Sequence, residues 1–276
     1  MISYADNFED VYIQRVFADQ EKGFYIDIGA AHPVEGSITR HFYDQGWRGI
    51  NVEPLASYHA MLQVDRPRDL NLRVAVGSQE GTATFYNLGD AGGSTLSAET
   101  AEETQKLGFE LKTETIQVTT LRHICERHVK GPIDFIKIDV EGLEREVISG
   151  GDWTRFRPTL VVVEATRPFR PEPCHETWEP LLLEAGYAFA FFDGLNRYYL
   201  QVEEMARGTR LALPANVFDR FVPYRQYAAE KEAALLRARL SRGGWAKALA
   251  LRLKDTVLYG WLKGFERRVR RRLKRR

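Results

Sequence analysis

The sequence predicts an α/β fold built around a doubly wound parallel sheet with an antiparallel end. Short apolar or β-branched runs bounded by turn residues alternate with segments in which apolar residues recur every three or four positions. The first run, residues 24–28 (FYIDI), leads directly into a glycine-containing turn. The last two runs, residues 187–193 (YAFAFFD) and 197–202 (RYYLQV), are close enough to form an antiparallel pair. This alternation is typical of a parallel sheet with helices on both faces.

The remaining elements follow in the same order along the chain. Further core strands are expected at residues 49–53 (GINVE), 70–76 (LNLRVAV), 134–139 (DFIKID) and 160–164 (LVVVE). Helices are expected around residues 41–43, 55–64, 121–128, 143–148 and 178–185. Residues 78–121 are less regular. We interpret them as an insertion, with β segments at ATFYN and TIQVTTL joined by a Gly- and Thr-rich connection.

The composition fits one domain of ordinary size with an appendage. The chain has 276 residues, 44% of them hydrophobic, and a net charge of +1, which argues against a molecule that binds nucleic acid through its overall charge. Cys125 and Cys174 stand apart without a disulfide or zinc pattern. The acidic N-terminus lacks the features of a secretory signal, and no apolar stretch approaches the roughly 18 residues of a membrane span. A cytoplasmic location is therefore expected.

The C-terminal part of the chain differs in character from the rest. We expect residues 1–223 to form the main domain and residues 224–276 a helical, basic amphipathic tail, with a first helix at residues 228–240. From Trp245 onward, apolar residues alternate with Lys and Arg at helical spacing, which suits an anionic membrane surface such as the inner face of a cell membrane. The alternative is a partner-docking or partly disordered tail. Nucleic-acid binding is disfavoured because no recognition motif accompanies the basic run.

Two acidic residues at strand ends point to a nucleoside site. Asp27 is followed at once by Gly29 and Ala30, and Glu53 ends the next strand, where an acidic residue typically binds the ribose hydroxyls. A D-x-G sequence alone can also be a simple strand-to-helix turn, and Glu53 weakens that interpretation. A nicotinamide-dependent oxidoreductase would require G-x-G-x-x-G, whereas this chain has D-I-G-A-A-H-P.

Several separated motifs then resemble the FkbM family of methyltransferases. The resemblance covers roughly residues 3–223. The motifs that carry it are YADNFEDV, FYIDIGA, the Ser37-x-Thr39 pair, GWRGINVEP, IKIDVEGLEREV and VVVEA, with HETWEPLLLEAGY, DGLNRYYL and PANVFDRF similar to one subgroup. It implies a seven-stranded, Rossmann-like methyltransferase sheet, S-adenosylmethionine as methyl donor and a hydroxyl acceptor on a sugar, a glycan or a glycosylated metabolite.

The resemblance also implies a set of donor-binding residues. Glu53 would bind the ribose, and an N-terminal segment with Tyr4, Asn7 and Asp10 would close over the site. The other expected donor-binding residues are Asp27, Gly29, Ala30, Pro54, Ala75, Val76 and Asp139. The chain departs from the family pattern at His32 and Pro33, where members often have Asn and Gly, so the details of that loop stay open.

Acidic residues at the ends of later strands suggest an acceptor site. Asp139, Glu141 and Glu164 would converge on the carboxyl edge of the sheet, and His175, just beyond, is a candidate general base. We expect Asp139, Glu164 and His175 to be the catalytic residues. Asp139 and Glu164 would either hold a divalent ion or hydrogen-bond the acceptor and donor without metal. We prefer the second interpretation because the sequence offers no convincing third ligand.

Other residues near this edge have ordinary structural interpretations. Glu144 and Glu146 suit a solvated helix face that pairs with Arg145 or Lys137. His175 suits an exposed helix start as well as a base. Asp193, Gly194 and Asn196 predict a hairpin turn, with acceptor recognition as the alternative. Aromatic residues near the expected mouth would either stack on a sugar or belong to the core, and these are Trp178, Tyr198 and Tyr199.

The leading hypothesis is thus an O-methyltransferase acting on a sugar-bearing acceptor, in a setting such as polysaccharide biosynthesis. The competing hypothesis from another class is a non-catalytic nucleoside-binding or membrane-associated scaffold of the same fold. Asp27, Glu53, Asp139 and Glu164 argue against the scaffold because it would not need them. The sequence leaves the oligomeric state open.

Overall fold

The computed structural model describes residues 1–89 and 93–239. The chain divides into a compact unit, Met1–Val222, and a second unit that begins at Pro223. The first unit contains both larger sheets and every residue discussed below as part of the site.

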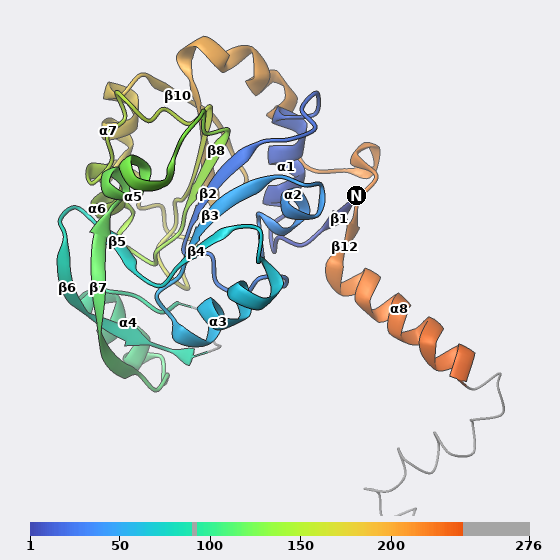
Figure 1. Ribbon diagram of the computed structural model, residues 1–276, viewed down its shortest axis with the longest axis horizontal. Helices are drawn as coiled ribbons and strands as arrows, with labels where there is room; N and C mark the ends of the chain where they lie inside the picture. The colour runs from blue at the N-terminus through green and yellow to red at the C-terminus, as the bar shows by residue number, and fades with distance from the viewer. Residues whose placement is uncertain (90–92, 240–276) are drawn as a thin grey trace, which may run out of the picture. The chain divides into compact units, whose positions relative to one another are not determined.

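The first unit is built on a seven-stranded sheet with the spatial order β10-β11-β9-β8-β2-β3-β4 (Figure 1). Its strands are β2 (Phe24–Ile28), β3 (Arg48–Val52), β4 (Leu70–Leu72), β8 (Phe135–Ile138), β9 (Leu160–Glu164), β10 (Tyr187–Phe192) and β11 (Asn196–Gln201). The five strands from β9 to β4 run parallel, while β11 is antiparallel to both β9 and β10. The predicted Rossmann-like sheet with an antiparallel end is confirmed.

Helices cover both faces of this sheet. They are α1 (Glu9–Val16), α2 (Arg40–Asp44), α3 (Ala56–Asp65), α5 (Leu121–His128), α6 (Glu144–Ser149) and α7 (Glu179–Glu184). One apolar cluster joins the sheet to α5, α6 and α7 through Ile124, Val147 and Leu182. A second joins the opposite face to α1 and α2 through Ile13 and Phe42. Among the described residues of this unit, 3₁₀ helices also occur at η2 (His175–Thr177), η3 (Val202–Leu211) and η4 (Val217–Asp219).

The irregular middle section forms a small sheet of its own. It consists of β5 (Ala75–Gly77), β6 (Gly81–Asn87) and β7 (Lys112–Thr120), with α4 (Ala98–Lys106) between the last two strands. The two predicted β segments are confirmed, and they pair antiparallel. The single strand predicted over residues 70–76 is wrong. It breaks at Arg73 and Val74, because β4 pairs with β3 in the large sheet and β5 pairs with β7 in the small one.

The register of the large sheet brings polar residues together at its carboxyl edge. Asp27 on β2 lies beside Lys137 on β8, and Asn196 on β11 lies opposite Glu164 on β9. Asp139 follows the end of β8 at the same edge. Since side chains alternate between the two faces of a strand, residues 27, 137 and 139 share a face. This face is covered by α1.

The N-terminal strand β1 (Ile2–Ser3) pairs with β12 (Val222–Pro223). The second unit contains α8 (Tyr224–Arg239), which begins four residues before the helix predicted at residues 228–240 and is the last described element. The predicted amphipathic stretch from residue 245 onward lies outside the described residues. Among the helices that the structure describes, none is both long and apolar enough to cross a membrane.

Candidate active site

The turn after β2 requires a glycine at its first position. Gly29 has a φ of 79°, and a Cβ atom built on it would lie 1.9 Å from the carbonyl oxygen of Asp139. The N–H groups of Gly29 and Ala30 both donate to the carbonyl of Val52, at 3.0 and 3.1 Å. The turn is thereby fixed to the ends of both β3 and β8. Any side chain at this position would strain the backbone and separate the strand ends.

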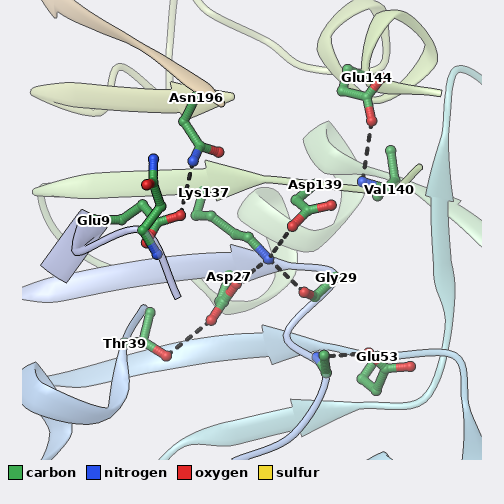
Figure 2. A network of polar contacts seen from close by, with 12 residues as sticks. Glu9, Asp27, Gly29, Thr39, Glu53, Lys137, Asp139, Val140, Glu144 and Asn196 are labelled. Carbon is green, nitrogen blue, oxygen red and sulfur yellow. Dashed lines mark hydrogen bonds and ion pairs between the residues drawn. The ribbon is translucent and has the colours of Figure 1, made fainter. Parts of the chain in front are cut away.

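Glu53, directly after β3, holds the neighbouring loops with both of its oxygens. Oε2 accepts a hydrogen bond of 2.8 Å from the N–H of Ala31 (Figure 2). Oε1 accepts one of 2.7 Å from the N–H of Leu55. The carboxyl group is buried, and burial raises its pKa to about 7. A carboxylate offers about four acceptor positions, so two of them stay available to a ligand.

A pocket opens at this edge, with about 810 Å³ of empty space including its mouth. Six of the sequence-predicted residues line it, and they are Gly29, Glu53, Pro54, Ala75, Val76 and Asp139. Apolar walls come from Leu55, Tyr58 and Phe85.

Two predicted donor-binding residues are not in the pocket lining. Ala30 is buried beside it, and Ala31, at a φ of 49°, lines the pocket instead. Asp27 is only 1% exposed. Its Oδ2 accepts a hydrogen bond of 2.9 Å from Thr39 Oγ1, below the pocket floor. The predicted roles of Asp27 and Ala30 in donor binding stay predictions. Their positions allow contact with the donor through neighbouring groups.

Three carboxyl groups gather at the other side of the pocket. One oxygen each of Asp139, Glu141 and Glu164 lies within 4.8 Å of the others. Asp139 and Glu141 line the pocket, and Glu164 lies behind them. Burial, followed by the nearby charge of Asp139, raises the pKa of Glu141 to about 8 and that of Glu164 well above its usual value. The buried Oε2 of Glu164 accepts no hydrogen bond from the described residues.

Sequence reasoning missed the cation of this site. Lys137 was expected to pair with surface glutamates, and the structure instead buries it, with 6% of the residue exposed. Its ammonium donates to the Gly29 carbonyl at 2.6 Å and forms ion pairs with Asp139 at 3.3 Å and Asp27 at 3.5 Å (Figure 2). Burial alone would lower the pKa of Lys137, but Asp139 and Asp27 reverse this effect, so the pKa lies above its usual value.

The expected solvated position of Glu144 is also wrong. Glu144 is 3% exposed, and its Oε1 accepts hydrogen bonds from the N–H groups of Val140 and Gly142, at 3.2 and 3.1 Å. The side chain therefore holds the loop between β8 and α6, and with it the backbone of Glu141. Glu144 is the first residue of α6, and its hydrogen bonds to the loop before the helix compensate for the burial of its carboxyl group.

His175 lies in a different group of contacts from the three carboxyls. Its Nε2 is 3.8 Å from Glu179 Oε2, and Glu179 Oε1 accepts hydrogen bonds from Arg197 and Tyr199, each at 2.8 Å. The ring also meets Trp178 edge to face. These contacts fit a residue that fixes the start of α7. The predicted role of His175 as a base stays a prediction.

The hairpin predicted at the antiparallel end is confirmed. Asp193 Oδ1 accepts from the N–H groups of Leu195 and Asn196, and Gly194 has a φ of 102°. The N-terminal segment docks here, because Asn196 Nδ2 donates to Glu9 Oε1 at 2.9 Å and Asn7 Nδ2 donates to the Asp193 carbonyl at 3.3 Å. The aromatic residues weighed as sugar platforms belong to the core, since Trp178, Tyr198 and Tyr199 are at most 1% exposed.

The fold and this pocket define a Rossmann-like methyltransferase that uses S-adenosylmethionine. The chain belongs to the FkbM family of methyltransferases, because residues 27–189 match the family described as "Methyltransferase FkbM domain". This match covers more than half of the 276 residues. The chain matches no curated protein.

Two solved structures share the general arrangement at low similarity. One is a TehB-like SAM-dependent methyltransferase from Corynebacterium glutamicum, with 10% identity, a TM-score of 0.38 and coverage of 69% of this chain and 87% of that one. The other is an O-methyltransferase from Bacillus cereus in complex with SAH, with 13% identity, a TM-score of 0.37 and coverage of 70% of this chain and 79% of that one.

Proposed function

We propose that the chain transfers a methyl group from S-adenosylmethionine to a hydroxyl oxygen of a sugar, a glycan or a glycosylated metabolite. One observation carries the proposal. Glu53, Asp139 and Glu141 line the same pocket, so an acid suited to a ribose and acids suited to an acceptor hydroxyl face one space.

The pocket fits the donor in chemistry. Apolar walls near Ala75 and Val76 suit the adenine, and Pro54 extends them. Glu53 retains acceptor positions for the ribose hydroxyls, and Gly29 allows the backbone to approach the ligand. The carboxylate of Asp139 suits the cationic amino group of the donor's amino acid portion. When bound, the donor supplies a methyl group already activated on a sulfonium, so the protein has to align the acceptor and remove its proton.

We assign proton removal to the three clustered carboxyls. Asp139 and Glu141 line the pocket, while Glu164 lies within 4.8 Å of both through one oxygen of each residue. The raised pKa of Glu164 makes it a stronger base than an ordinary carboxylate. Asp139, which forms an ion pair with Lys137 at 3.3 Å, suits the cationic amino group of the donor better than Glu164 does. Glu164 is therefore the proposed holder of the acceptor proton, and His175 is the alternative.

The same three carboxyls offer enough oxygens for a divalent ion. Lys137 already balances part of their charge. Glu141 supplies the third possible ligand that the sequence argument lacked, so the proposal that alignment and proton removal proceed without a metal rests on Lys137.

The sugar as acceptor rests on the polar character of this edge. Sugar hydroxyls donate to carboxylates, and the carboxylates of Asp139 and Glu141 line the pocket. The test is incubation of the protein with S-adenosylmethionine labelled in its methyl group and a panel of free sugars, nucleotide sugars and oligosaccharides. Label in a sugar ether, stable to alkali, supports the proposal. Members of the panel that carry amino groups are included. Label found only on the nitrogen of these amino groups contradicts the proposal.

The competing scaffold function would keep donor binding and lose turnover. Asp139, Glu141 and Glu164 argue against it, because placing three carboxyls side by side is costly and a scaffold gains nothing from it. Donor binding without label transfer to any member of the panel would favour the scaffold.

We also propose that residues 224–276 act as a separate segment that binds an anionic membrane surface. The support is the sequence alone, in which Lys and Arg alternate with Trp, Leu and Phe from residue 245 onward. Co-sedimentation with vesicles should require anionic lipid and weaken with added salt. Binding that is indifferent to both would point to a protein partner.

A further inference from the structure

We propose that Lys137 is a positioning residue for methyl transfer, which fixes the carboxylate of Asp139 relative to the Gly29 turn so that donor and acceptor meet in one geometry. The inference rests on the proposed function, since it assumes that donor binding involves both groups. Lys137 itself is not in the pocket lining.

The contacts of the ammonium group carry the proposal. Nζ lies 2.6 Å from the Gly29 carbonyl oxygen, 3.3 Å from Asp139 Oδ2 and 3.5 Å from Asp27 Oδ1. The contact with the Gly29 carbonyl is a hydrogen bond, and the contacts with Asp139 and Asp27 are ion pairs. Gly29 and Asp139 both line the pocket, and they belong to the ends of β2 and β8. Lys137 therefore joins the two strand ends from below.

The surroundings make this link rigid. Lys137 lies within β8 between two fully buried residues, Ile136 and Ile138, and its own side chain is 7% exposed. Asp27 is held from the other side by Thr39 Oγ1, and Thr39 in turn accepts a hydrogen bond of 2.8 Å from the buried Arg66. A buried side chain with all neighbours hydrogen-bonded or packed has few alternative rotamers. The Asp139 carboxylate consequently has a fixed partner on its inner side.

A purely structural ion pair would need less than this arrangement provides. Asp27 alone could balance the charge of Lys137, and Asp27 lies outside the pocket lining. The shortest contact of the ammonium is instead to the glycine turn, and the second ion pair is to a residue of the pocket. A structural ion pair does not require the contacts with Gly29 and Asp139, and both of these residues line the pocket.

The test is calorimetric titration of the full-length protein with S-adenosylmethionine. K137M removes the charge and keeps an unbranched side chain. We expect it to raise the Kd by about tenfold or more, because Asp139 and the Gly29 carbonyl lose their donor. In a D139N background the same K137M change should raise the Kd by less than about threefold, because residues that act through one another are not additive. Equal fold-changes in the two backgrounds would overturn the inference.

Two further variants separate positioning from folding. K137M leaves Asp27 buried without its cation, which is itself destabilising. D27N neutralises that partner, so D27N and D27N/K137M are compared with each other, and we again expect about a tenfold difference in Kd between them. Equal affinities in this pair would overturn the inference. Y25F is the matched structural control, since Tyr25 is buried on β2, two residues from Asp27, and donates to Asp69.

Y25F should lower the melting temperature while leaving the Kd for S-adenosylmethionine unchanged. If Y25F weakens donor binding as much as K137M does, the effect follows stability and the inference is overturned. If the wild-type protein binds the donor and the Lys137 substitutions leave the Kd unchanged, this inference alone is overturned. Wild-type protein that does not bind S-adenosylmethionine overturns the proposed function, and this inference with it.

Discussion

Glu53 Oε2 and the backbone N–H of Ala31 are joined by a hydrogen bond of 2.8 Å, which connects the end of β3 to the turn after β2. The same side chain lines the pocket, so the ribose acid also fixes the loop that surrounds the ligand. We expect E53A to abolish binding of S-adenosylmethionine. E53Q, which keeps one acceptor oxygen, should raise the Kd by about tenfold or more, because charge-assisted hydrogen bonds are lost. Calorimetry measures both variants.

E126Q is the control for E53A and E53Q, because Glu126 lies on α5, forms an ion pair with Arg122 and does not line the pocket. Its Kd should equal that of the wild type. An unchanged Kd in E53A would remove Glu53 from the donor site.

The identity of the proton acceptor is decided by two substitutions. E164Q is expected to keep donor affinity and to lower the rate of methyl transfer by about 100-fold or more, since a positioned base contributes on this order. H175A is expected to retain most of the rate, because the His175 ring contacts Glu179 and Trp178. Single-turnover rates at saturating donor, measured on an acceptor found in the labelled panel, distinguish the two. Loss of the rate in H175A with a normal rate in E164Q would reverse the assignment.

The stability of the ligand-free protein should fall as the pH rises. Burial raises the pKa of Glu9 to about 8 and that of Glu53 to about 7, whereas an unfolded chain has an ordinary value near 4.5. Between these values the folded state holds protons that the unfolded state has released. The free energy of unfolding therefore decreases with pH, by about 1.4 kcal/mol per pH unit for each such proton.

Scanning calorimetry should accordingly give a higher melting temperature at pH 6 than at pH 8. In E9Q the same interval should show a shallower slope, because a neutral amide replaces a group that titrates there. A melting temperature that rises from pH 6 to pH 8 would contradict the assigned pKa values.

Removal of divalent ions tests whether the three clustered carboxyls hold a metal ion or act without one. Lys137 already balances part of the charge of Asp139, Glu141 and Glu164, so we expect methyl transfer to continue after dialysis against a chelator. Turnover with and without added magnesium or manganese is the measurement. Activity that disappears with the chelator and returns with one ion would establish a metal site at these carboxyls.

Most of the large sheet was predictable because its strands are short and bounded by turn residues. Residues 24–28 and 160–164 form strands with the predicted bounds, and the strands predicted at residues 49–53 and 134–139 differ by one residue at each end. Residues 70–76 failed because an apolar run does not reveal which sheet it joins. Here its two halves pair with different partners, β3 and β7.

Helix α4 was missed because a Thr- and Gly-rich connection resembles a loop. A signal was present, since Ser97 begins a run of good helix formers and its side chain accepts from the N–H of Thr100. This is the pattern of a helix N-cap. Burial of Thr100, Ala101 and Thr104 on one face of the helix supplies what the propensities of its threonines do not.

The donor side of the site was largely predictable and the buried cation was not. Gly29 and Glu53 follow from strand ends, which the sequence marks clearly. Lys137 was assigned to the surface because lysine is usually exposed. Its place inside an apolar strand of a sheet covered on both faces was the missed signal, since such a lysine requires a carboxylate partner, and Asp27 lies beside it in the register.

The central claim is that the pocket bounded by Gly29, Glu53 and Asp139 binds S-adenosylmethionine. Its most direct test is calorimetric titration of the wild-type protein with S-adenosylmethionine and, in parallel, with NAD, each with and without magnesium. The account predicts one-to-one binding of S-adenosylmethionine under both conditions and no binding of NAD. Absence of S-adenosylmethionine binding, or binding of NAD in its place, would contradict it.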